Sequence, residues 1–159
     1  MNNPVIRPAE AGDAAALVAL IDALNHHEAG LVDDRRTDIL AARECLASLQ
    51  ARIARDGGGL HVAVTAGAVV GMIGWVIEVG EPYLQAHLRK FALITDLVVA
   101  EGQRGAGVGR ALIRSVEDEA RLHGLPRLAI SVLAANHAAI DAYRSQGFAP
   151  DMQIMMKAL

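Results

Sequence analysis

The sequence predicts an α/β protein in which helices cover both faces of a mixed β-sheet. Residues 60–65 and 69–79 are almost wholly apolar and are separated by a short glycine-containing turn, which is typical of an antiparallel hairpin. Strands without polar alternation indicate a sheet that is buried on both faces. A strand at residues 91–99, a helix at 107–123 and a strand at 127–133 follow, and this order predicts a parallel pair joined by a right-handed crossover.

Length and charge fit one globular domain over residues 1–159. The chain is 53% hydrophobic and 21% charged, which favours a folded protein over a disordered one. A net charge of −3 provides no broad basic surface for nucleic acid. The N-terminus does not resemble a signal peptide and no apolar run approaches membrane-spanning length, so we expect a cytoplasmic protein without a membrane partner. The single cysteine, Cys45, is expected to be a buried small hydrophobe.

Two helices are predicted after a short first strand at residues 4–7. Asp13 is placed to cap the first helix, which runs to Asn25 or beyond. Thr37 and Asp38 open the second helix. Their apolar stripes consist of Leu17, Leu20, Ile21 and Leu24 in the first helix, and of Ile39, Leu40, Leu46, Leu49 and Ile53 in the second.

The sequence His26-His27-Glu28 between these helices is unsuited to a metal ion. Neighbouring residues point in different directions on a helix, unlike the paired ligands of a His-x-x-x-His motif. We therefore expect a solvated helix end and no metal site. The triplet Gly57-Gly58-Gly59 predicts a turn, and residues 80–89 predict a loop that either lines a substrate pocket or merely crosses the surface.

A glycine-rich loop follows the strand at residues 91–99. Gly105, Gly107 and Gly109 leave the backbone amides of residues 104–109 uncovered by side chains, and the next helix directs its unpaired N–H groups to the same place. The loop is therefore suited to phosphate. It lacks the lysine and hydroxyl of a Walker loop, and Arg110 stands where a dinucleotide fingerprint needs its third glycine.

A second motif lies at residues 136–148, Asn136-His-Ala-Ala-Ile-Asp-Ala-Tyr143-Arg-Ser-Gln-Gly-Phe148. Asn136 is placed to cap a helix, and Tyr143 follows about two turns later on a similar face. Together the sequence Arg104-Gly-Ala-Gly-Val-Gly109 and this second motif resemble the GCN5-related N-acetyltransferase (GNAT) superfamily, whose last helix carries Asn-x-x-Ala-x-x-x-Tyr-x-x-x-Gly-Phe.

The resemblance implies a fold with a central twisted mixed sheet of six or seven strands and about four helices, including a final strand at residues 153–157. It also implies acetyl-CoA as the acyl donor. The pantetheine arm would contact the main chain of Leu97, Val98 and Val99, and the side chain of Asn136. The pyrophosphate would bind to Arg104, Gly105, Ala106, Gly107, Val108, Gly109 and Arg110. The first two helices and their loop would wall the site of an amine acceptor.

The implied reaction needs an acid and a base. Tyr143 is suited to protonate the departing thiolate, because a phenol with a pKa near 10 stays protonated at neutral pH. Some relatives carry Glu-Asp-Leu where this chain has Thr95-Asp96-Leu97, and threonine cannot act as a base. Asp96, Glu78 and a water molecule remain as candidate bases, with His61 and His87 below them.

We therefore expect an acetyl-CoA-dependent N-acetyltransferase that acts on a primary amine of a small molecule or peptide. The alternative is a noncatalytic acyl-CoA-binding regulatory module of the same fold. A homodimer is a further expectation, with Ile154-Met155-Met156 as the contact if these residues are exposed.

Overall fold

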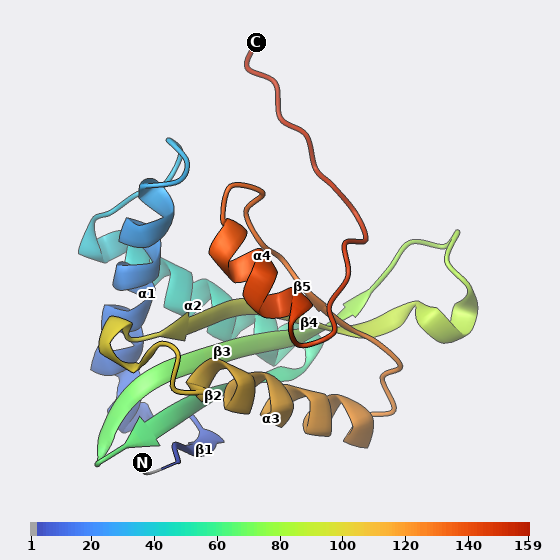
Figure 1. The fold of residues 1–159 in the computed structure, drawn as a ribbon. Coiled ribbons are helices and arrows are strands. Elements are labelled where there is room, and N and C mark those ends of the chain that lie inside the picture. The colour runs from blue at the N-terminus through green and yellow to red at the C-terminus, as the bar shows by residue number, and fades with distance from the viewer. Residues whose placement is uncertain (1–2) are drawn as a thin grey trace.

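The computed structural model describes residues 3–159. Over these residues the chain forms five strands and four α-helices (Figure 1). In order they are β1 (Val5–Pro8), α1 (Ala14–Ala29), α2 (Ile39–Asp56), β2 (Gly58–Thr65), β3 (Ala68–Val79), β4 (Lys90–Val99), α3 (Val108–Leu122), β5 (Leu128–Ile130) and α4 (His137–Arg144). Short 3-10 turns cover Ala11–Asp13, Ala86–Leu88 and Glu101–Gln103.

The strands form one mixed sheet in the order β1-β2-β3-β4-β5. The first three neighbouring pairs are antiparallel, and β4 and β5 are parallel and joined through α3. The predicted hairpin and the predicted parallel pair are confirmed. The expected count of six or seven strands is wrong for the described residues, because the sheet ends at β5.

Helices cover both faces of this sheet, as the apolar strands predict. Leu112, Ile113 and Val116 of α3 pack with Trp75 and Ile94 on one face. On the opposite face α1 and α2 pack against β2 and β3 through Leu17, Ile21, Leu46, Leu49, Val62 and Met72. Figure 1 shows α3 on the side of the sheet opposite α1 and α2. Each central strand is therefore apolar on both sides because both of its sides are covered.

A β-bulge in the central pair decides which side chains of β4 face α1 and α2. The register between β3 and β4 shifts between Gly74 and Trp75. Ile94 packs on the α3 face, whereas Val98, four residues later, packs on the α1 and α2 face. Since side chains of a regular strand alternate with period two, the extra residue reverses the pattern and directs Asp96 to the same face as Val98.

The last eleven residues, 149–159, form no regular structure, and all of them are exposed. The predicted final strand at 153–157 is therefore wrong, because no edge within the described chain pairs with it. A strand exists only where a neighbour satisfies its backbone groups, and the local sequence does not supply that neighbour.

Three smaller expectations also fail. Cys45 is exposed, because the buried stripe of α2 runs through Leu46 and Leu49 instead. Gly58 and Gly59 belong to β2 and do not form a turn. The strand predicted at 127–133 is confined to Leu128–Ile130, a truncation that opens the sheet beside β4.

Candidate active site

The glycine-rich loop connects the end of β4 to the start of α3. Gly105 and Gly107 have positive φ values of 77° and 83°, a conformation that L side chains rarely adopt. A Cβ atom at either position would meet no heavy atom of residues 3–159 within 4 Å, so the backbone here borders open space. Val108 is only 2% exposed and holds the first turn of α3 against the core. The first amides of α3 therefore face an accessible and rigidly supported site, which fits a phosphate group.

One edge of β4 is open directly before this loop. Pairing between β4 and β5 ends at Ile94 and Ile130, so no strand among residues 3–159 pairs with residues 95–99 on that side. On the other side Ala100 N–H donates to the Val70 carbonyl, and Val98 lies opposite Met72. Antiparallel strands alternate their hydrogen bonds, so Val98 directs its backbone groups toward β3, and Leu97 and Val99 direct theirs toward the open edge.

The Val99 carbonyl accepts a hydrogen bond from Arg104 Nε at 3.3 Å, which agrees with this orientation. Of the three residues expected to contact pantetheine through their main chain, the geometry thus favours Leu97 and Val99. Beyond Ile94 and Ile130 the strands β4 and β5 are no longer paired. A gap, or slot, then runs along β4 to the loop and is bordered by backbone groups without a strand partner. Such a slot suits a linear ligand that carries amides at one end and phosphates at the other.

Asn136 and Tyr143 lie at the two ends of α4. The Asn136 side-chain oxygen accepts a hydrogen bond from Ala139 N–H at 3.1 Å, so the predicted capping role is confirmed. Tyr143 makes an edge-to-face contact with Phe148, with ring centroids 6.0 Å apart. Both rings pack against the core cluster that also contains Leu97 and Val99. Tyr143 therefore packs on the α3 face of the sheet, as Leu97 and Val99 do.

The environment of Tyr143 keeps its hydroxyl protonated. Burial raises the pKa of Tyr143 above 10.0, and the negative charge of Glu28 raises it further. At neutral pH the group is therefore a proton donor.

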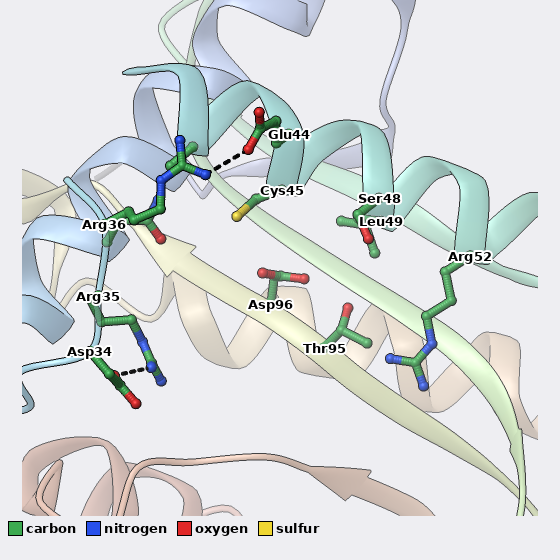
Figure 2. Close-up of a pocket in the computed structure, with 12 residues that line it drawn as sticks. Asp34, Arg35, Arg36, Glu44, Cys45, Ser48, Leu49, Arg52, Thr95 and Asp96 are labelled. Carbon is green, nitrogen blue, oxygen red and sulfur yellow. Dashed lines mark hydrogen bonds and ion pairs between the residues drawn. The ribbon is translucent and has the colours of Figure 1, made fainter. Parts of the chain in front are cut away.

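A cavity of about 520 Å³ lies on the opposite side of β4, between this strand, α2 and the segment that follows α1. Figure 2 shows Thr95 and Asp96 on β4 facing Cys45 and Ser48 on α2. The remaining lining residues are Asn25, Asp34, Arg35, Arg36, Ala41, Glu44, Leu49 and Arg52. Thr95 donates a hydrogen bond to the Gly74 carbonyl at 3.2 Å, at the β-bulge. The bulge thus places Asp96 inside the cavity.

Asp96 is the candidate base that the structure brings into this cavity. Burial raises the pKa of Asp96; Thr95 and Arg52 act to lower it, and Glu28 acts to raise it. A carboxylate with a raised pKa is a stronger proton acceptor than an exposed one. The negative charge of Glu28 acts to raise the pKa of both Asp96 and Tyr143.

Glu78, the other candidate carboxylate, lies elsewhere. It is opposite Phe91 on β4, four residues beyond Gly74, which is about 13 Å along the strand. Its carboxylate accepts a hydrogen bond from Arg52 at 2.6 Å and does not line the cavity. The structure therefore separates Glu78 from Asp96, with Arg52 between the two.

Ion pairs around the cavity are a feature that sequence reasoning missed. Glu28 accepts a hydrogen bond from Arg35 at 2.6 Å, and Arg36 bridges Asp38 at 3.0 Å and Glu44 at 2.7 Å. The segment at residues 28–36 lies between the two predicted helices and includes Glu28, Asp33, Asp34, Arg35 and Arg36. Opposite charges close together in this segment indicate that ion pairs can form, but they do not indicate which residues pair.

The two lower candidate bases lie away from this cavity. His61 is 5% exposed, with Nε2 at 3.0 Å from Glu119 and Nδ1 at 2.9 Å from the Ser115 hydroxyl, on the α3 side of the sheet. His87 lies in the 3-10 turn Ala86–Leu88, and no residue of 80–89 lines the cavity. His61 is therefore a packed histidine that joins β2 to α3.

His26 and His27 occupy the last turns of α1, where the Nδ1 atom of His26 lies 2.9 Å from the Asp22 carbonyl. Within residues 3–159 no three His, Cys, Asp or Glu side chains are grouped to hold a metal ion. Among the described helices none is long and apolar enough to cross a membrane.

Comparison with known proteins gives a consistent result. The model of the acetyltransferase (GNAT) family matches residues 25–148. Streptothricin acetyltransferase of Streptomyces lavendulae is 48% identical over 56 residues, which is 35% of this chain and 30% of that protein. N-acetyltransferase family 8 member 3 of Rattus norvegicus is 33% identical over 109 residues, 65% of this chain and 46% of that protein. The matches thus span less than half the length of these relatives.

Solved structures agree with the fold. A tetramutant of a Bacillus halodurans protein superposes with a TM-score of 0.80 at 24% identity, over 98% of this chain and 99% of the other. The aminoglycoside antibiotic 6′-N-acetyltransferase of Acinetobacter haemolyticus superposes with a TM-score of 0.72 at 17% identity, over 100% of this chain and 98% of the other. At these identities the likeness concerns the fold alone.

Proposed function

Because the chain belongs to the acetyltransferase (GNAT) family, we propose that it transfers the acetyl group of acetyl-CoA directly to a primary amine of a small molecule or peptide. The carbon–nitrogen bond forms as the carbon–sulfur bond of the thioester breaks. An ammonium acceptor loses two protons, one before attack and one from the nitrogen after attack, and the departing thiolate takes up one, so one proton is released overall.

Acetyl-CoA would bind along β4 and at the start of α3. The backbone amides of residues 104–110 would hold the pyrophosphate, because Gly105 and Gly107 leave that backbone open. The main chain of Leu97 and Val99, at the open edge of β4, would hydrogen-bond the pantetheine arm. Asn136 already uses its side-chain oxygen in the helix cap, so its amide nitrogen would be the atom offered to the ligand.

Asp96 would accept the proton of the incoming ammonium, directly or through water. A primary amine resembling lysine has a pKa near 10.4 and is mostly protonated at neutral pH. The raised pKa of Asp96 and its place in the cavity support this role over Glu78, which is paired with Arg52. The N–H of Leu97 or Val99 would polarise the thioester carbonyl, and the Tyr143 hydroxyl would protonate the departing thiolate.

A single observation carries this proposal. Within five residues of β4 the chain presents a half-buried carboxylate to a cavity on one face. It also presents an edge without a strand partner, beside a tyrosine that packs on the other face. A noncatalytic acyl-CoA module would need the open edge and the loop, but it would have no use for Asp96 in a cavity.

The test is acceptor-dependent release of CoA thiol from acetyl-CoA, measured with a panel of amines. The panel begins with streptothricin, because a relative that matches this chain is a streptothricin acetyltransferase. Release that requires both protein and amine, together with acetylated amine in the mass spectrum, supports the enzyme. Acetyl-CoA binding without release for any amine supports the regulatory module.

A further inference from the structure

The charged side chains around the cavity beside Asp96 include more carboxylates than arginines. Each arginine that lines the cavity pairs with two carboxylates, namely Arg35 with Glu28 and Asp34, Arg36 with Asp38 and Glu44, and Arg52 with Asp56 and Glu78. Arg55 also pairs with Asp56, and Asp96 forms no ion pair within residues 3–159. The set thus comprises four arginines and seven carboxylates, an excess of three negative charges. Such a site attracts cations and repels anions.

Glu28 is the least exposed of the carboxylates that pair with these lining arginines. Its side chain is 23% exposed, whereas that of Glu44 is 56% exposed. Glu28 lies in the last turn of α1, three residues after Asn25, which lines the cavity. Arg35 Nε donates a hydrogen bond to its carboxylate at 2.6 Å. Because water and salt screen a less exposed charge less, Glu28 attracts a cation more strongly than the exposed Glu44 does.

Arg35 can leave Glu28 without loss of a backbone hydrogen bond. It lies in the connection between α1 and α2, where residues 32–37 belong to no helix or strand. In the described chain, residues 33–37 neither donate nor accept a backbone–backbone hydrogen bond. Ion pairs of Arg35 with α1 and of Arg36 with α2 hold this stretch instead. A cation of another molecule can therefore replace the Arg35 guanidinium at the cost of one partly exposed ion pair.

We propose that the acceptor carries a second cationic group, which binds to Glu28 in place of Arg35 while the reacting amine lies at Asp96. This inference rests on the proposed function and names its substrate class, a small amine with at least two cationic groups and no carboxylate. Arg35 and Asp96 line the same cavity, so the guanidinium marks the place of the second cation. In Figure 2 Asp96 lies between Arg35 and Arg52. The acceptor would thus extend from Asp96 toward the connection between α1 and α2.

The same charges disfavour an acceptor that bears a carboxylate. Each lining arginine already contacts two carboxylates, so an anionic group of the ligand would find no unpaired arginine among the lining residues. It would also be repelled by the excess of negative charge. Free amino acids should therefore be poor acceptors, although they carry an amine.

Three amines that share a five-carbon chain test this inference: 1,5-diaminopentane, 1-aminopentane and L-lysine. The monoamine lacks the second cation, and lysine adds a carboxylate to the diamine. Release of CoA thiol from acetyl-CoA gives kcat/KM for each amine, and the value for the diamine is halved because its two ends are equivalent. At low salt we expect the wild type to prefer the diamine over the monoamine by about threefold or more, and over lysine by about tenfold or more.

Three variants locate the second cation. Glu28→Gln should reduce the preference for the diamine over the monoamine to less than about twofold, because the carboxylate is lost. Arg35→Gln should raise this preference to about tenfold, because the carboxylate no longer has a competing guanidinium. Glu44→Gln is the matched control, since Glu44 also accepts a hydrogen bond from an arginine of the same connection, at 2.7 Å, and the wild-type preference should persist. A preference that persists in Glu28→Gln, or that falls in Arg35→Gln, would overturn the proposal.

Calorimetric titration with 1,5-diaminopentane in the presence of CoA separates this inference from the proposed function. Binding by the wild type that is weakened in Glu28→Gln, without acetylation of any amine, would support the cation site and refute acetyl transfer. Acetylation of amines without preference for the diamine would support acetyl transfer and refute the cation site. Absence of both binding and acetylation would refute both.

Discussion

Replacing Tyr143 with phenylalanine removes the proposed general acid and little else. The phenyl ring keeps the contact with Phe148, whose ring centroid lies 6.0 Å away. No protein hydrogen bond to the hydroxyl is present among residues 3–159, so its removal leaves no described partner unpaired. We expect the free energy of unfolding to change by less than about 1 kcal/mol.

We expect Tyr143→Phe to lower the turnover number, kcat. Removal of a general acid commonly lowers a rate by about 10² to 10⁴, which corresponds to roughly 2.7 to 5.5 kcal/mol of transition-state stabilisation. Because Tyr143 acts on the sulfur only as the thioester breaks, acetyl-CoA affinity should change by less than about threefold. The kcat therefore falls while the dissociation constant stays nearly constant.

The assay follows CoA thiol release with a saturating amine, and a calorimetric titration gives the acetyl-CoA affinity. Tyr83→Phe is the matched control, since Tyr83 is 81% exposed and lies outside the cavity. Because the pKa of Tyr143 is raised above 10.0, less than half of this group should be ionised at any pH below 10, so its ionisation should lower the wild-type rate by less than twofold there. A kcat within twofold of wild type in Tyr143→Phe would remove this residue from the mechanism.

Three further predictions concern the candidate base, an ion pair and the cavity wall. Asp96→Asn should lower kcat/KM by about 10² or more and flatten the acidic limb of its pH profile. In the wild type the midpoint of this limb should lie above pH 3.8, because burial raises the pKa of Asp96. An acidic limb that is unchanged in Asp96→Asn would exclude Asp96 as the base. Arg7 donates two hydrogen bonds to the Asp13 carboxylate, at 2.7 and 2.9 Å, and lowers the pKa of Asp13 from 3.8 to about 2. The ionised carboxylate therefore stabilises the fold above pH 3.8, and this stabilisation is lost as the pH falls toward 2. Thermal melts should therefore show Asp13→Asn less stable than wild type at pH 7, by a margin that shrinks with acidification; a margin independent of pH would contradict the pairing. Leu49→Ala should cost about 2 to 5 kcal/mol in urea unfolding because Leu49 is 5% exposed, whereas Leu122→Ala should cost less than about 0.5; equal costs would contradict the packing.

The sequence predicts most of the framework because local rules govern it. The apolar runs that become β2 and β3 indicate a two-sided sheet, and the structure covers both sides. Asn136 caps α4 as its position before an apolar helix predicts. Glycine spacing alone marks the loop, and the positive φ values of Gly105 and Gly107 give the physical reason for those residues.

Features that depend on neighbours distant in sequence could not be predicted. The β-bulge at Gly74 reverses the alternation of β4, so no strand pattern indicates that Asp96 faces the cavity. Glu78 is equally plausible from the sequence, and only its pairing with Arg52 separates it from the site. The strand expected at 153–157 requires a partner edge, which the pattern of its own residues does not supply.

Binding of acetyl-CoA to the loop after β4 is the claim on which the mechanism depends, and calorimetric titration of Gly107→Asp measures it most directly. Gly67→Asp is the matched control, because Gly67 has a similar φ of 79° and open space around it, but lies in the hairpin turn between β2 and β3. Both variants place an aspartate at a positive φ and add the same charge. We predict saturable acetyl-CoA binding by the wild type and Gly67→Asp, and its loss in Gly107→Asp. Equal binding by all three proteins would contradict the assignment of the loop.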